Sequence, residues 1–308
     1  MDDIAVLIPV YNEERTIGKV IEDFSKVLPK NSYIYVYDNN SSDNSFVIAQ
    51  DTNKAICRKE QNQGKGNVIR RMFREVDASI YVIVDADDTY SPNDLMRIIG
   101  PIQNNNVDMV VGDRLSSSYF VENKRMFHNF GNVLMKRLVN FFFQSNIKDV
   151  MTGYRAFSRR FVKTFPCLSK GFEVETEMTI HAIDKNLNIE NVIVDYKDRP
   201  MGSYSKLNTI TDGISCFFTF VKFFILYRPL IFFGAVAIIL FTIATILIWP
   251  IFIEYGKTRL VPRFPTLMGS IFIYTIAVQS FFTGLILEIL NNNNRQEFEH
   301  KLIEQGII

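Results

Sequence analysis

Two long segments near the C-terminus contain no charged residue, and this feature limits the possible folds more than any other. Pro229 to Ile253 and Phe264 to Leu287 hold no Asp, Glu, Lys or Arg. As a helix, each segment would be about 36 Å long, against roughly 30 Å for the hydrocarbon core of a bilayer. A soluble core rarely buries two neighbouring helices that are apolar on all sides. We therefore predict two transmembrane helices within residues 229–290, at about 229–253 and 264–288, that form a hairpin.

The N-terminus bears on the orientation of this hairpin. It reads MDDIAVLIPVYNEE, which is acidic from the start and lacks the basic region of a signal peptide. We expect the N-terminal part to stay in the cytosol, and two spans would return the tail, residues 291–308, to the same side. The connecting loop carries Lys257, Arg259 and Arg263, which runs against the positive-inside rule. The expectation of a multi-pass inner-membrane protein with a cytosolic N-terminal domain therefore rests on the N-terminus.

Residues 211–228, just before the first predicted span, are rich in Phe. The segment is too interrupted to cross a bilayer, and Lys222 lies inside it. An amphipathic helix lying in the membrane interface fits this pattern. A core helix of the N-terminal domain is the alternative interpretation.

Composition excludes several other classes of protein. The 34 Lys+Arg balance 33 Asp+Glu, so there is no broad basic field and we expect no nucleic-acid partner. Apolar residues make up 47% of the chain, which excludes a disordered protein. The three cysteines and three histidines are scattered, so the sequence supports neither a disulfide framework nor a zinc site.

The first part of the chain alternates between short apolar runs and helical patterns. This alternation predicts an α/β domain over residues 1–210, with a Rossmann-like, mostly parallel sheet. Ser91 and Pro92 are a typical N-cap and first residue of a helix. Strands are expected at Ile4–Val10, Tyr33–Tyr37, Lys54–Cys57, Ile80–Val84 and Asp108–Gly112, and helices at Thr16–Val27, Gly66–Glu75 and from Pro92.

Polar clusters follow three of these expected strands, at residues 9–14, 38–43 and 85–89. Ligands of parallel sheets bind beyond the carboxyl ends of the strands, so the three clusters should meet at one edge. The usual phosphate-binding loops are absent, because no GxGxxG follows the first strand and no Walker A loop is present. The sheet is thus of the nucleotide-binding type without either common phosphate loop.

Asp85 and Asp87 suggest what replaces those loops. In an extended tip, residues i and i+2 share a face, so both carboxylates can reach one hard cation. Mg²⁺ and Mn²⁺ are commonly held by one or two carboxylates plus substrate phosphates, and would stabilise a departing diphosphate. A solvated turn is the alternative, since Asp is a common turn residue.

Several ordered motifs together resemble a known family. Ile8 to Glu13 (IPVYNE), the Asp38 cluster, Gln63 to Gly66 (QGKG) and Asp85 to Asp87 (DAD) resemble the inverting family 2 glycosyltransferases of the GT-A fold. The motifs DVMTGYR, from Asp149, and RPMGSYSKL, from Arg199, resemble its polyprenyl-phosphate branch. That branch includes dolichol-phosphate mannose synthase and bacterial undecaprenyl-phosphate glucosyltransferases. The likeness covers roughly residues 4–210, and the two-helix tail is similar to that of bacterial members.

The resemblance implies transfer of one hexose from a nucleotide-sugar to polyprenyl (undecaprenyl) phosphate, with Mg²⁺ or Mn²⁺ as cofactor. UDP-glucose or UDP-N-acetylhexosamine is the expected donor, with GDP-mannose behind. The product would be a lipid-linked sugar for cell-envelope or O-antigen glycan modification. The residues implied to bind the donor are Pro9, Tyr11, Asn12, Glu13, Asp38, Asn39, Gln63, Lys65, Asp85, Ala86 and Asp87, with Asp85 and Asp87 as metal ligands.

Some of these positions depart from the usual family pattern or have a second interpretation. The family usually shows Asp-Asp-Gly-Ser after the second strand, whereas this chain has Asp38-Asn39-Asn40-Ser41. The Asn39 carbonyl can still accept from a uracil N3–H. Thr89 stands where some relatives carry Gln next to the metal. Asp87 is therefore the metal ligand that the family pattern supports best. Lys65 contacts the donor or is a solvated loop lysine.

A lipid phosphate is an unusual acceptor, because its second pKa of about 6 leaves an oxygen anionic near neutral pH. The site therefore needs positive charge and positioning more than a strong base. The implied catalytic residues are Asp87, Asp149 and Arg199, where Asp149 would orient the acceptor or an arginine. The candidate acceptor-phosphate ligands are Arg114, Arg125, Arg155, Arg199 and Lys206.

Two of these assignments have plain structural alternatives. Arg199 and Lys206 also fit a solvated basic loop attracted to anionic lipid. Glu173, Glu175 and Glu177 are acidic residues entering a helix, where they favour its dipole. Only Glu175 or Glu177 is a candidate for a functional role.

Two other functions remain as alternatives. A processive polysaccharide synthase would carry a QxxRW motif, but the sole Trp, Trp249, lies inside a predicted span. A non-catalytic membrane scaffold that keeps a nucleotide-sugar fold is the alternative from another class. A homo-oligomer is possible, and the sequence does not fix its size.

Overall fold

The computed structural model describes residues 2–105, 107–117, 119, 126–200 and 209–304. The chain divides into two compact units, Met1–Thr219 and Phe220–Ile308. The division falls inside α9 (Thr209–Tyr227), so this helix belongs partly to each unit.

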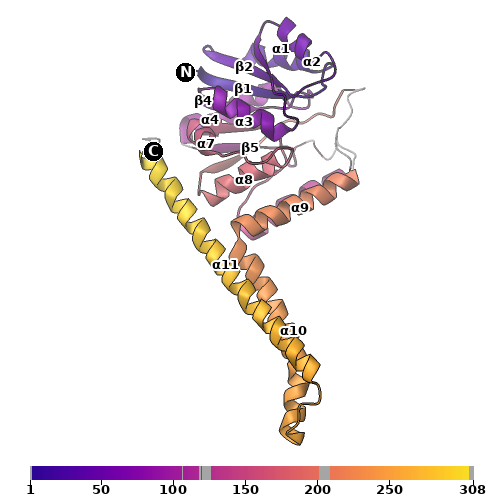
Figure 1. Cartoon of the computed structure of the whole chain (residues 1–308). Coiled ribbons are helices and arrows are strands. Elements are labelled where there is room, and N and C mark those ends of the chain that lie inside the picture. Colours follow the sequence, from indigo (N-terminus) through magenta and orange to yellow (C-terminus); the bar gives the residue numbers. More distant parts are fainter. Residues whose placement is uncertain (1, 106, 118, 120–125, 201–208, 305–308) are drawn as a thin grey trace. The chain divides into compact units, whose positions relative to one another are not determined.

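Unit 1 is built on one seven-stranded sheet with the strand order β3-β2-β1-β4-β6-β5-β7 (Figure 1). Only β6 among these strands runs antiparallel to its neighbours, β4 and β5. The expectation of an α/β domain with a mostly parallel sheet is thus confirmed. The strands are β1 (Asp2–Val10), β2 (Ser32–Asp38), β3 (Ala55–Lys59), β4 (Ala78–Ile83), β5 (Met109–Asp113), β6 (Arg155–Ser158) and β7 (Ile189–Ile193).

The helices of unit 1 begin close to where the sequence pattern places them. The helix expected from Pro92 opens as a short 3₁₀ turn, Pro92–Asp94, and continues as α4. Three of the helices, α2, α6 and α7, were not predicted; α2 and α7 have seven and six residues, too few for a clear periodicity. The helices are α1 (Ile17–Val27), α2 (Ser45–Asp51), α3 (Lys65–Glu75), α4 (Leu95–Asn105), α6 (Met126–Phe143), α7 (Arg159–Thr164) and α8 (Val174–Asp184).

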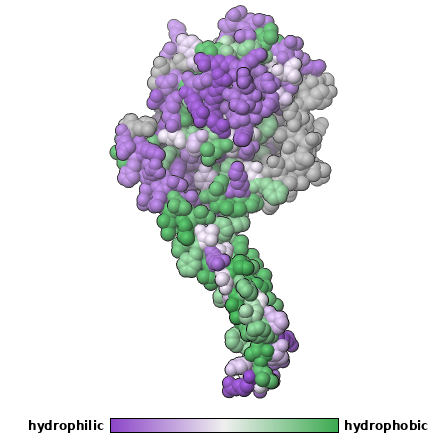
Figure 2. Space-filling view, viewed as in Figure 1, coloured by the Kyte–Doolittle hydropathy of each residue, from purple (hydrophilic) through white to green (hydrophobic). Residues whose placement is uncertain are grey.

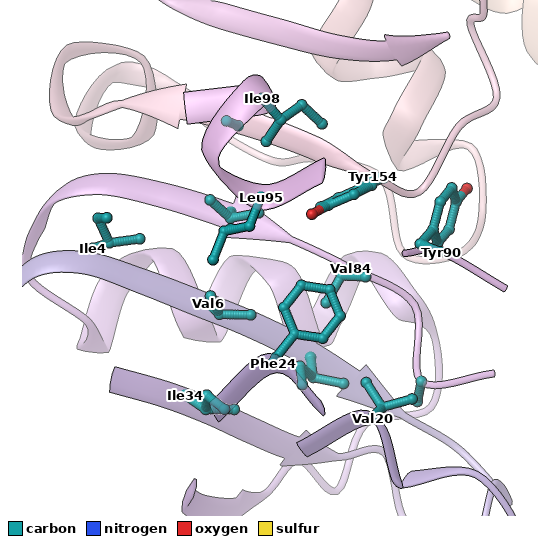
Figure 3. Close-up of a cluster of buried hydrophobic side chains, with 14 of the residues drawn as sticks. Ile4, Val6, Val20, Phe24, Ile34, Val84, Tyr90, Leu95, Ile98 and Tyr154 are labelled. Carbon is teal, nitrogen blue, oxygen red and sulfur yellow. The ribbon is translucent and has the colours of Figure 1, made fainter. Parts of the chain in front are cut away.

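The core of unit 1 follows from the alternation of side chains along β1. Ile4, Val6 and Ile8 point to one face of the sheet and pack with side chains of α1 and α4, including Phe24 (Figure 3). Ala5 and Leu7 between them are fully buried too, on the opposite face, where α3 contacts β1. Because both faces are covered, β1 is a near-continuous apolar run, as expected for a central parallel strand.

The strand order places one edge of the sheet at a topological switch point. β2 and β3 follow β1 on one side, whereas β4 lies on its other side, so the connections diverge between the carboxyl ends of β1 and β4. Because β6 is antiparallel, the residues that precede it reach this same edge. β7 is parallel to β5, so the residues after Ile193 arrive there as well. Four separate chain segments therefore supply side chains to one place.

Unit 2 contains two long helices, α10 (Pro229–Thr258) and α11 (Phe264–Glu304), which pack side by side (Figure 1). Small residues lie at their contact: Ser270, Ala277 and Gly284 of α11 are buried, and a Cβ on Gly284 would lie 2.9 Å from the Cβ of Phe233. Both helices are long and apolar enough to cross a membrane, and 17% of the most apolar window of each is buried. The exposed surface along these helices is accordingly mostly apolar (Figure 2).

The predicted cytosolic tail at residues 291–308 continues α11 as far as Glu304, and its cytosolic location stays a prediction. α11 does not end near residue 288 but continues to Glu304. Arg295 reaches back to Glu288 at 3.6 Å, and Lys301 pairs with Glu297 one turn away at 2.7 Å, which supports the helix beyond its apolar part. α10 likewise extends five residues beyond the predicted end at Ile253, to Thr258.

The predicted interfacial helix at residues 211–228 corresponds to α9. Its described side chains divide into two sets: Phe220, Phe223 and Phe224 are buried, whereas Phe218 and Leu226 are exposed. The location of α9 in a membrane interface stays a prediction.

Candidate active site

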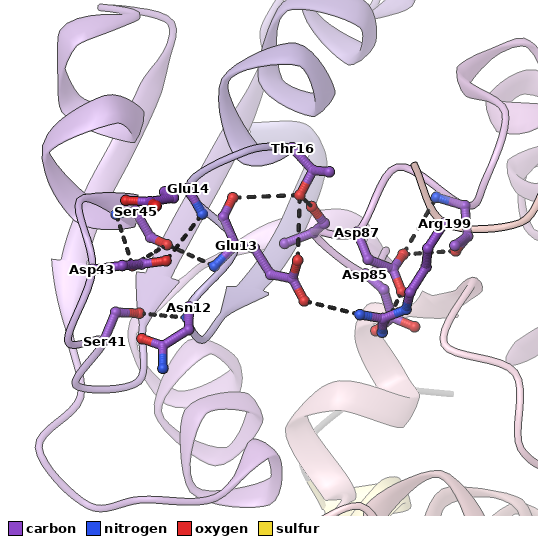
Figure 4. A network of polar contacts seen from close by, with 12 residues as sticks. Asn12, Glu13, Glu14, Thr16, Ser41, Asp43, Ser45, Asp85, Asp87 and Arg199 are labelled. Atoms are coloured by element: carbon purple, nitrogen blue, oxygen red, sulfur yellow. Dashed lines mark hydrogen bonds and ion pairs between the residues drawn. The ribbon is translucent and has the colours of Figure 1, made fainter. Parts of the chain in front are cut away.

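Asp87 lies at the carboxyl end of β4 and faces a guanidinium. Its Oδ2 is 2.7 Å from Nη2 of Arg199, and its Oδ1 accepts a 2.7 Å hydrogen bond from the hydroxyl of Thr89 (Figure 4). Thr89 therefore fixes the rotamer of Asp87. The Asp87 side chain is 9% exposed, so little water reaches its carboxylate, and each of the two oxygens has a protein partner.

Arg199 joins the ends of two strands that are neighbours in the sheet. While Nη2 faces Asp87 after β4, Nη1 lies 3.2 Å from Oε1 of Glu13 after β1 (Figure 4). Burial opposes the charge of Arg199, but the two carboxylates more than offset it and raise its pKa. The residue after β7 thus places a permanent positive charge at the switch point.

Asp85, two residues before Asp87, is held by a different cation. Nζ of Lys65, at the start of α3, lies 2.6 Å from Asp85 Oδ1 and 2.6 Å from Oε1 of Glu175 on α8. The Lys65 side chain is 10% exposed, so it is not a solvated loop lysine. Its ammonium faces two carboxylates of the protein, and its contact with a donor stays a prediction.

The close approach of Gly153 defines the other side of Asp85. A Cβ at Gly153 would lie 2.1 Å from Asp85 Oδ2, so no larger residue fits there without displacing the carboxylate. The backbone N–H of Gly153 donates to the hydroxyl of Tyr90 at 3.0 Å. The Thr-Gly segment before β6 therefore packs directly on the loop that carries Asp85.

The two carboxyl groups of this loop differ in proton affinity. Burial alone would raise the pKa of Asp85, but the charge and hydrogen bond of Lys65 hold it below its ordinary value. Burial raises the pKa of Asp87, and the negative charge of Asp85 raises it further, against the opposing charge of Arg199. The positive charge of Arg199 is thus the influence that favours the ionised form of Asp87 against burial and the neighbouring carboxylate.

A second buried ion pair lies at the same edge. Arg114, just after β5, donates to both oxygens of Asp149, from Nε at 2.7 Å and from Nη2 at 3.1 Å. The guanidinium also lies over the rings of Tyr119 and Tyr196, at 5.2 Å and 5.7 Å. Asp149 is fully buried, so it orients this arginine and is not itself in reach of solvent.

The polar cluster after β2 is used mainly to build the loops. The Asn39 amide donates to the carbonyl of Asn62 at 2.7 Å, and its own carbonyl accepts from Gly64 N–H at 2.7 Å. The contact between that side-chain carbonyl and a base stays a prediction. Asp38 Oδ2 accepts from Ser41 N–H at 3.0 Å, whereas its buried Oδ1 has no hydrogen-bond partner within the described part of the chain.

The other residues expected to bind a donor surround the end of β1. The side-chain Oδ1 of Asn12 accepts from Ser42 N–H at 2.8 Å, and the backbone carbonyl of Ala86 accepts from the Thr16 hydroxyl. The Gln63 side chain donates to the backbone carbonyl of Asn39 at 2.8 Å. Pro9 is half-buried at the end of β1, and Tyr11 is 38% exposed. The segments that carry these residues therefore meet, as expected, near the carboxyl ends of β1, β2 and β4.

The carboxylates at this edge of the sheet supply only some of the ligands that a hard cation needs. Among the described residues, no group of three or more His, Cys, Asp or Glu side chains is arranged to hold a metal ion. Asp87 already faces one cation, because the guanidinium of Arg199 lies 2.7 Å from its Oδ2. Asp85 and Asp87 offer oxygen ligands of the kind that Mg²⁺ and Mn²⁺ prefer, and a donor diphosphate would have to complete the set.

Residues 5–165 match the sequence profile described as glycosyl transferase family 2, and this match spans more than half of the chain. The chain belongs to glycosyl transferase family 2. The family expected from the motifs at the strand ends is thereby confirmed.

Three relatives illustrate how far this family 2 chain resembles other proteins. An uncharacterized protein of Shigella flexneri is 43% identical over 150 residues, which cover 49% of this chain and 91% of that protein. The dolichyl-phosphate hexose transferase of Haloferax volcanii is 27% identical over 221 residues, with coverages of 72% and 93%. The UDP-N-acetylglucosamine–dolichyl-phosphate N-acetylglucosaminyltransferase of Methanococcus voltae is 29% identical over 214 residues, with coverages of 61% and 83%.

Solved structures share the fold of unit 1. Glucosyl-3-phosphoglycerate synthase from Mycobacterium tuberculosis, crystallised with Mn²⁺, UDP and phosphoglyceric acid, gives a TM-score of 0.54 at 20% identity. The similarity covers 65% of this chain and 72% of that one. At this identity the likeness concerns the fold alone, and it confirms the GT-A architecture.

One residue predicted for the family 2 site, Arg155, is buried in the structure. Arg155 was expected to bind the acceptor phosphate, but it is 1% exposed and its guanidinium lies inside unit 1. It donates to the carbonyls of Val150 and Thr152 and, at 2.8 Å, to the hydroxyl of Thr179. Burial lowers the pKa of Arg155 to about 10. Arg155 therefore holds the segment before β6 in place. Arg125 and Lys206 lie outside the described residues.

Sequence reasoning undervalued the acidic start of α8. Glu175 pairs with Lys65, and Glu177 accepts from the backbone N–H groups of Leu168 and Ser169 at 2.9 and 2.8 Å. Glu177 thus shapes the loop that precedes α8. Glu175 resembles an ordinary helix-start acid because its partner Lys65 is distant in sequence, whereas the partners of Glu177 lie eight and nine residues away, in the loop before α8.

Proposed function

We propose that this protein is an inverting, metal-dependent hexosyltransferase that moves one sugar from a UDP-sugar to polyprenyl phosphate, with undecaprenyl phosphate as acceptor. The observation that carries the proposal is the position of Arg199. It places a fixed positive charge on the Asp87 carboxylate at the switch point, and Arg114 adds a second one at the same edge. Two anions, a donor diphosphate and an acceptor phosphate, need such charges in order to approach each other.

The donor half of the site is supported by the end of β2. The buried Oδ1 of Asp38 is an acceptor without a hydrogen-bond partner among the described residues, which suits an N–H or O–H of a nucleoside. The Mycobacterium tuberculosis neighbour was crystallised with UDP and Mn²⁺, which supports a uridine nucleotide here. Glucose and N-acetylhexosamines are the proposed sugars, with a GDP-sugar as the less favoured donor.

Asp87, with Asp85 beside it, would hold Mg²⁺ or Mn²⁺ together with the diphosphate of the donor. When bound, the cation would neutralise charge on the departing diphosphate. Lys65 keeps Asp85 ionised, and Thr89 keeps Asp87 oriented, so the chain itself presets both carboxylates. Arg199 must then exchange Asp87 for a phosphate, because one carboxylate oxygen does not serve both cations at full strength.

The proposed chemistry is a single displacement. A phosphate oxygen of the acceptor forms a bond to the anomeric carbon, and the bond from that carbon to the diphosphate oxygen breaks, so the nucleoside diphosphate leaves. No general base is needed, because the attacking oxygen is already anionic near neutral pH. Arg114, oriented by Asp149, and Arg199 stabilise the negative charge of both groups. Asn12 and Gln63, which were predicted to bind the nucleotide-sugar, act by shaping the loops around the nucleotide-sugar site.

The lipid acceptor is supported by relatives and by unit 2. The Haloferax volcanii and Methanococcus voltae relatives are named for transfer to dolichyl phosphate. α10 and α11 satisfy the length and composition of membrane spans. We propose insertion in the inner membrane with unit 1 in the cytosol, and a lipid-linked sugar that serves modification of cell-envelope glycan or O-antigen.

The test is a panel of labelled donors, UDP-glucose, UDP-N-acetylglucosamine, UDP-N-acetylgalactosamine and GDP-mannose, incubated with undecaprenyl phosphate and the protein in vesicles. We expect one UDP-sugar to label the lipid, with stimulation by Mn²⁺ or Mg²⁺. Asp87→Asn should abolish labelling. Asp88→Asn is the matched control, because Asp88 faces Lys19 and Lys197 instead of Arg199. Binding of donor without any transfer would favour a non-catalytic scaffold, and a polymeric product would favour a processive synthase.

A further inference from the structure

Gln279 is a polar side chain deep inside the apolar part of α11. It lies 15 residues after Phe264 and nine residues before Glu288. These separations correspond to about 22 Å and about 14 Å along a helix, which places Gln279 within the hydrocarbon if α11 spans a bilayer. The inference below rests on that proposed membrane insertion.

The other polar side chains in the central parts of the two helices have partners. Thr245 contacts the Tyr274 hydroxyl at 2.8 Å, and Ser280 donates to the Phe233 carbonyl at 3.0 Å. The carboxamide of Gln279 has no hydrogen-bond partner within the described residues and is exposed. An unpaired amide is costly in hydrocarbon, because no water can satisfy it. The hydroxyls that donate to carbonyls of their own helix are those of Thr242, Thr245, Ser270, Thr275 and Thr283.

Gln279 lies on the side of α11 that α10 leaves uncovered. Successive residues turn by about 100°, so Gln279 is about 200° from Ala277, which is buried against α10. A shallow groove of about 330 Å³ lies beside this free face, lined by Ile271, Tyr274, Thr275, Val278 and Gln279, and Tyr274 bounds it on the side of α10. Phe282 and Ile286 continue the face and are 54% and 57% exposed.

The spacing along this face is that of a helix–helix contact. Phe272, Thr275, Gln279, Phe282 and Ile286, all exposed, follow one another at intervals of three, four, three and four residues. Alternating steps of three and four keep side chains on a seam that faces a neighbouring helix. A seam with one central polar residue is a common means of fixing which helix pairs with which, and in what register.

We propose that this face of α11 binds the same face of a second copy of the chain, with the two Gln279 carboxamides hydrogen-bonded to each other. A carboxamide is both donor and acceptor, so two of them related by a two-fold axis satisfy each other. A lipid or polyprenyl chain offers neither group and would leave the amide unpaired. Hydrogen bonds of Gln between helices are a known source of association in membranes.

The test measures association of the full-length protein in vesicles of phosphatidylethanolamine and phosphatidylglycerol. Two populations carry different N-terminal fluorescent proteins, and energy transfer between them is followed as lipid dilutes the protein. We expect Gln279→Leu to dissociate at a protein density about tenfold higher than the wild type. Gln279→Asn, which keeps the amide, should fall between them. Thr242→Val, a control on α10 whose hydroxyl bonds its own helix, should behave as wild type.

A second measurement guards against a variant that fails to fold. Thr275→Cys, one turn from Gln279, should add an intermolecular disulfide that Thr242→Cys does not add. The proposal is overturned if the wild type is monomeric at the highest density, or if Gln279→Leu associates as tightly as the wild type. It is also overturned if undecaprenyl phosphate dissociates the wild type, because the groove would then hold the lipid chain.

The same vesicles separate this inference from the proposed function. Resistance to alkaline carbonate extraction reports insertion, and labelled sugar transfer reports activity. Association without any sugar transfer would remove the proposed function and leave the Gln279 contact standing. Failure to insert would remove the Gln279 contact, whereas transfer by a peripheral protein would still be measurable.

Discussion

Arg199 Nη2 lies 2.7 Å from Asp87 Oδ2, across a gap of more than a hundred residues in the sequence. The contact puts a permanent cation on the carboxylate that is proposed to hold Mg²⁺ or Mn²⁺. Arg199 also contacts Glu13, so the same residue ties the end of β1 to the end of β4. Its charge is therefore positioned before any substrate arrives, as electrostatic catalysis requires.

The first prediction concerns Arg199→Gln. Loss of the guanidinium should lower kcat/KM for sugar transfer by about 10² to 10³-fold, because a charge that stabilises the transition state is removed. The same change should strengthen Mn²⁺ binding in the absence of donor by roughly tenfold, since a competing cation leaves Asp87. Electron paramagnetic resonance of free Mn²⁺ measures the second effect. Arg159→Gln is the control, because Arg159 pairs with Asp77 at an exposed site. Unchanged or weaker Mn²⁺ binding would contradict this account of Arg199.

The second prediction concerns the pair of Arg114 and Asp149. Arg114→Lys keeps the positive charge but loses the two-point contact with the carboxylate, so we expect a loss of kcat of about 10² with a smaller change in stability. Asp149→Asn leaves a buried guanidinium without its counter-charge and should lower the free energy of unfolding by about 3 kcal/mol. Steady-state kinetics with varied lipid, together with urea unfolding, separate the two effects. Equal loss of stability in both variants would argue that the pair is only structural.

The parts of this site that could be predicted from the sequence share one property. Glu13, Asp85 and Asp87 directly follow apolar runs that could only be central strands, so their convergence follows from the direction of parallel strands. Arg199 was predicted from the family resemblance, but its contact with Asp87 depends on where β7 lies in the sheet. That position depends on β6, a four-residue antiparallel strand too short to show a period.

Other residues were missed or misjudged because no local sequence pattern reveals their contacts. Lys65 and Glu175 are separated by more than a hundred residues, and a glutamate at a helix start has an adequate local explanation. Arg155 carries a charge, which usually means a surface position, yet the backbone carbonyls around it satisfy its guanidinium in the interior. The Asn39 amide suits a hydrogen bond to a nucleotide base as well as one to the loop backbone, so the sequence alone does not distinguish the two.

The third prediction concerns the ion-paired triad of Lys65, Asp85 and Glu175, in which the Asp85 side chain is 28% exposed and the other two are nearly buried. Lys65→Met leaves the two carboxylates without their shared cation, so the free energy of unfolding should fall by about 3 kcal/mol, the lower end of the range for a broken buried pair. Adding Glu175→Gln to Lys65→Met should recover part of that loss, because one of the unpaired charges is then removed. Urea unfolding of the four proteins of this double-mutant cycle gives the coupling. Additive losses would mean that Lys65 and Glu175 do not act on each other.

The fourth prediction is a pH dependence of stability that arises from His181. Burial among Phe161 and Phe165 lowers the pKa of His181 from 6.5 to about 4, so the folded protein holds this imidazole neutral. The unfolded chain takes up a proton below pH 6.5 and the folded one does not until about pH 4. The contribution of His181 to the free energy of unfolding is therefore fully present above pH 6.5. It declines as the pH falls to 4, by roughly 3 kcal/mol in total. His181→Leu should show a shallower decline in urea unfolding over that range, and identical slopes for both proteins would refute the assignment.

The central claim is that the acceptor is the phosphate of a polyprenyl lipid. The most direct measurement compares labelled sugar transfer from the preferred UDP-sugar to undecaprenyl phosphate and to undecaprenol, which has the same chain without the phosphate. We predict organic-extractable label with undecaprenyl phosphate alone, and none with the Asp87→Asn variant. Equal labelling of undecaprenol, or label that appears only in a water-soluble product, would contradict the account.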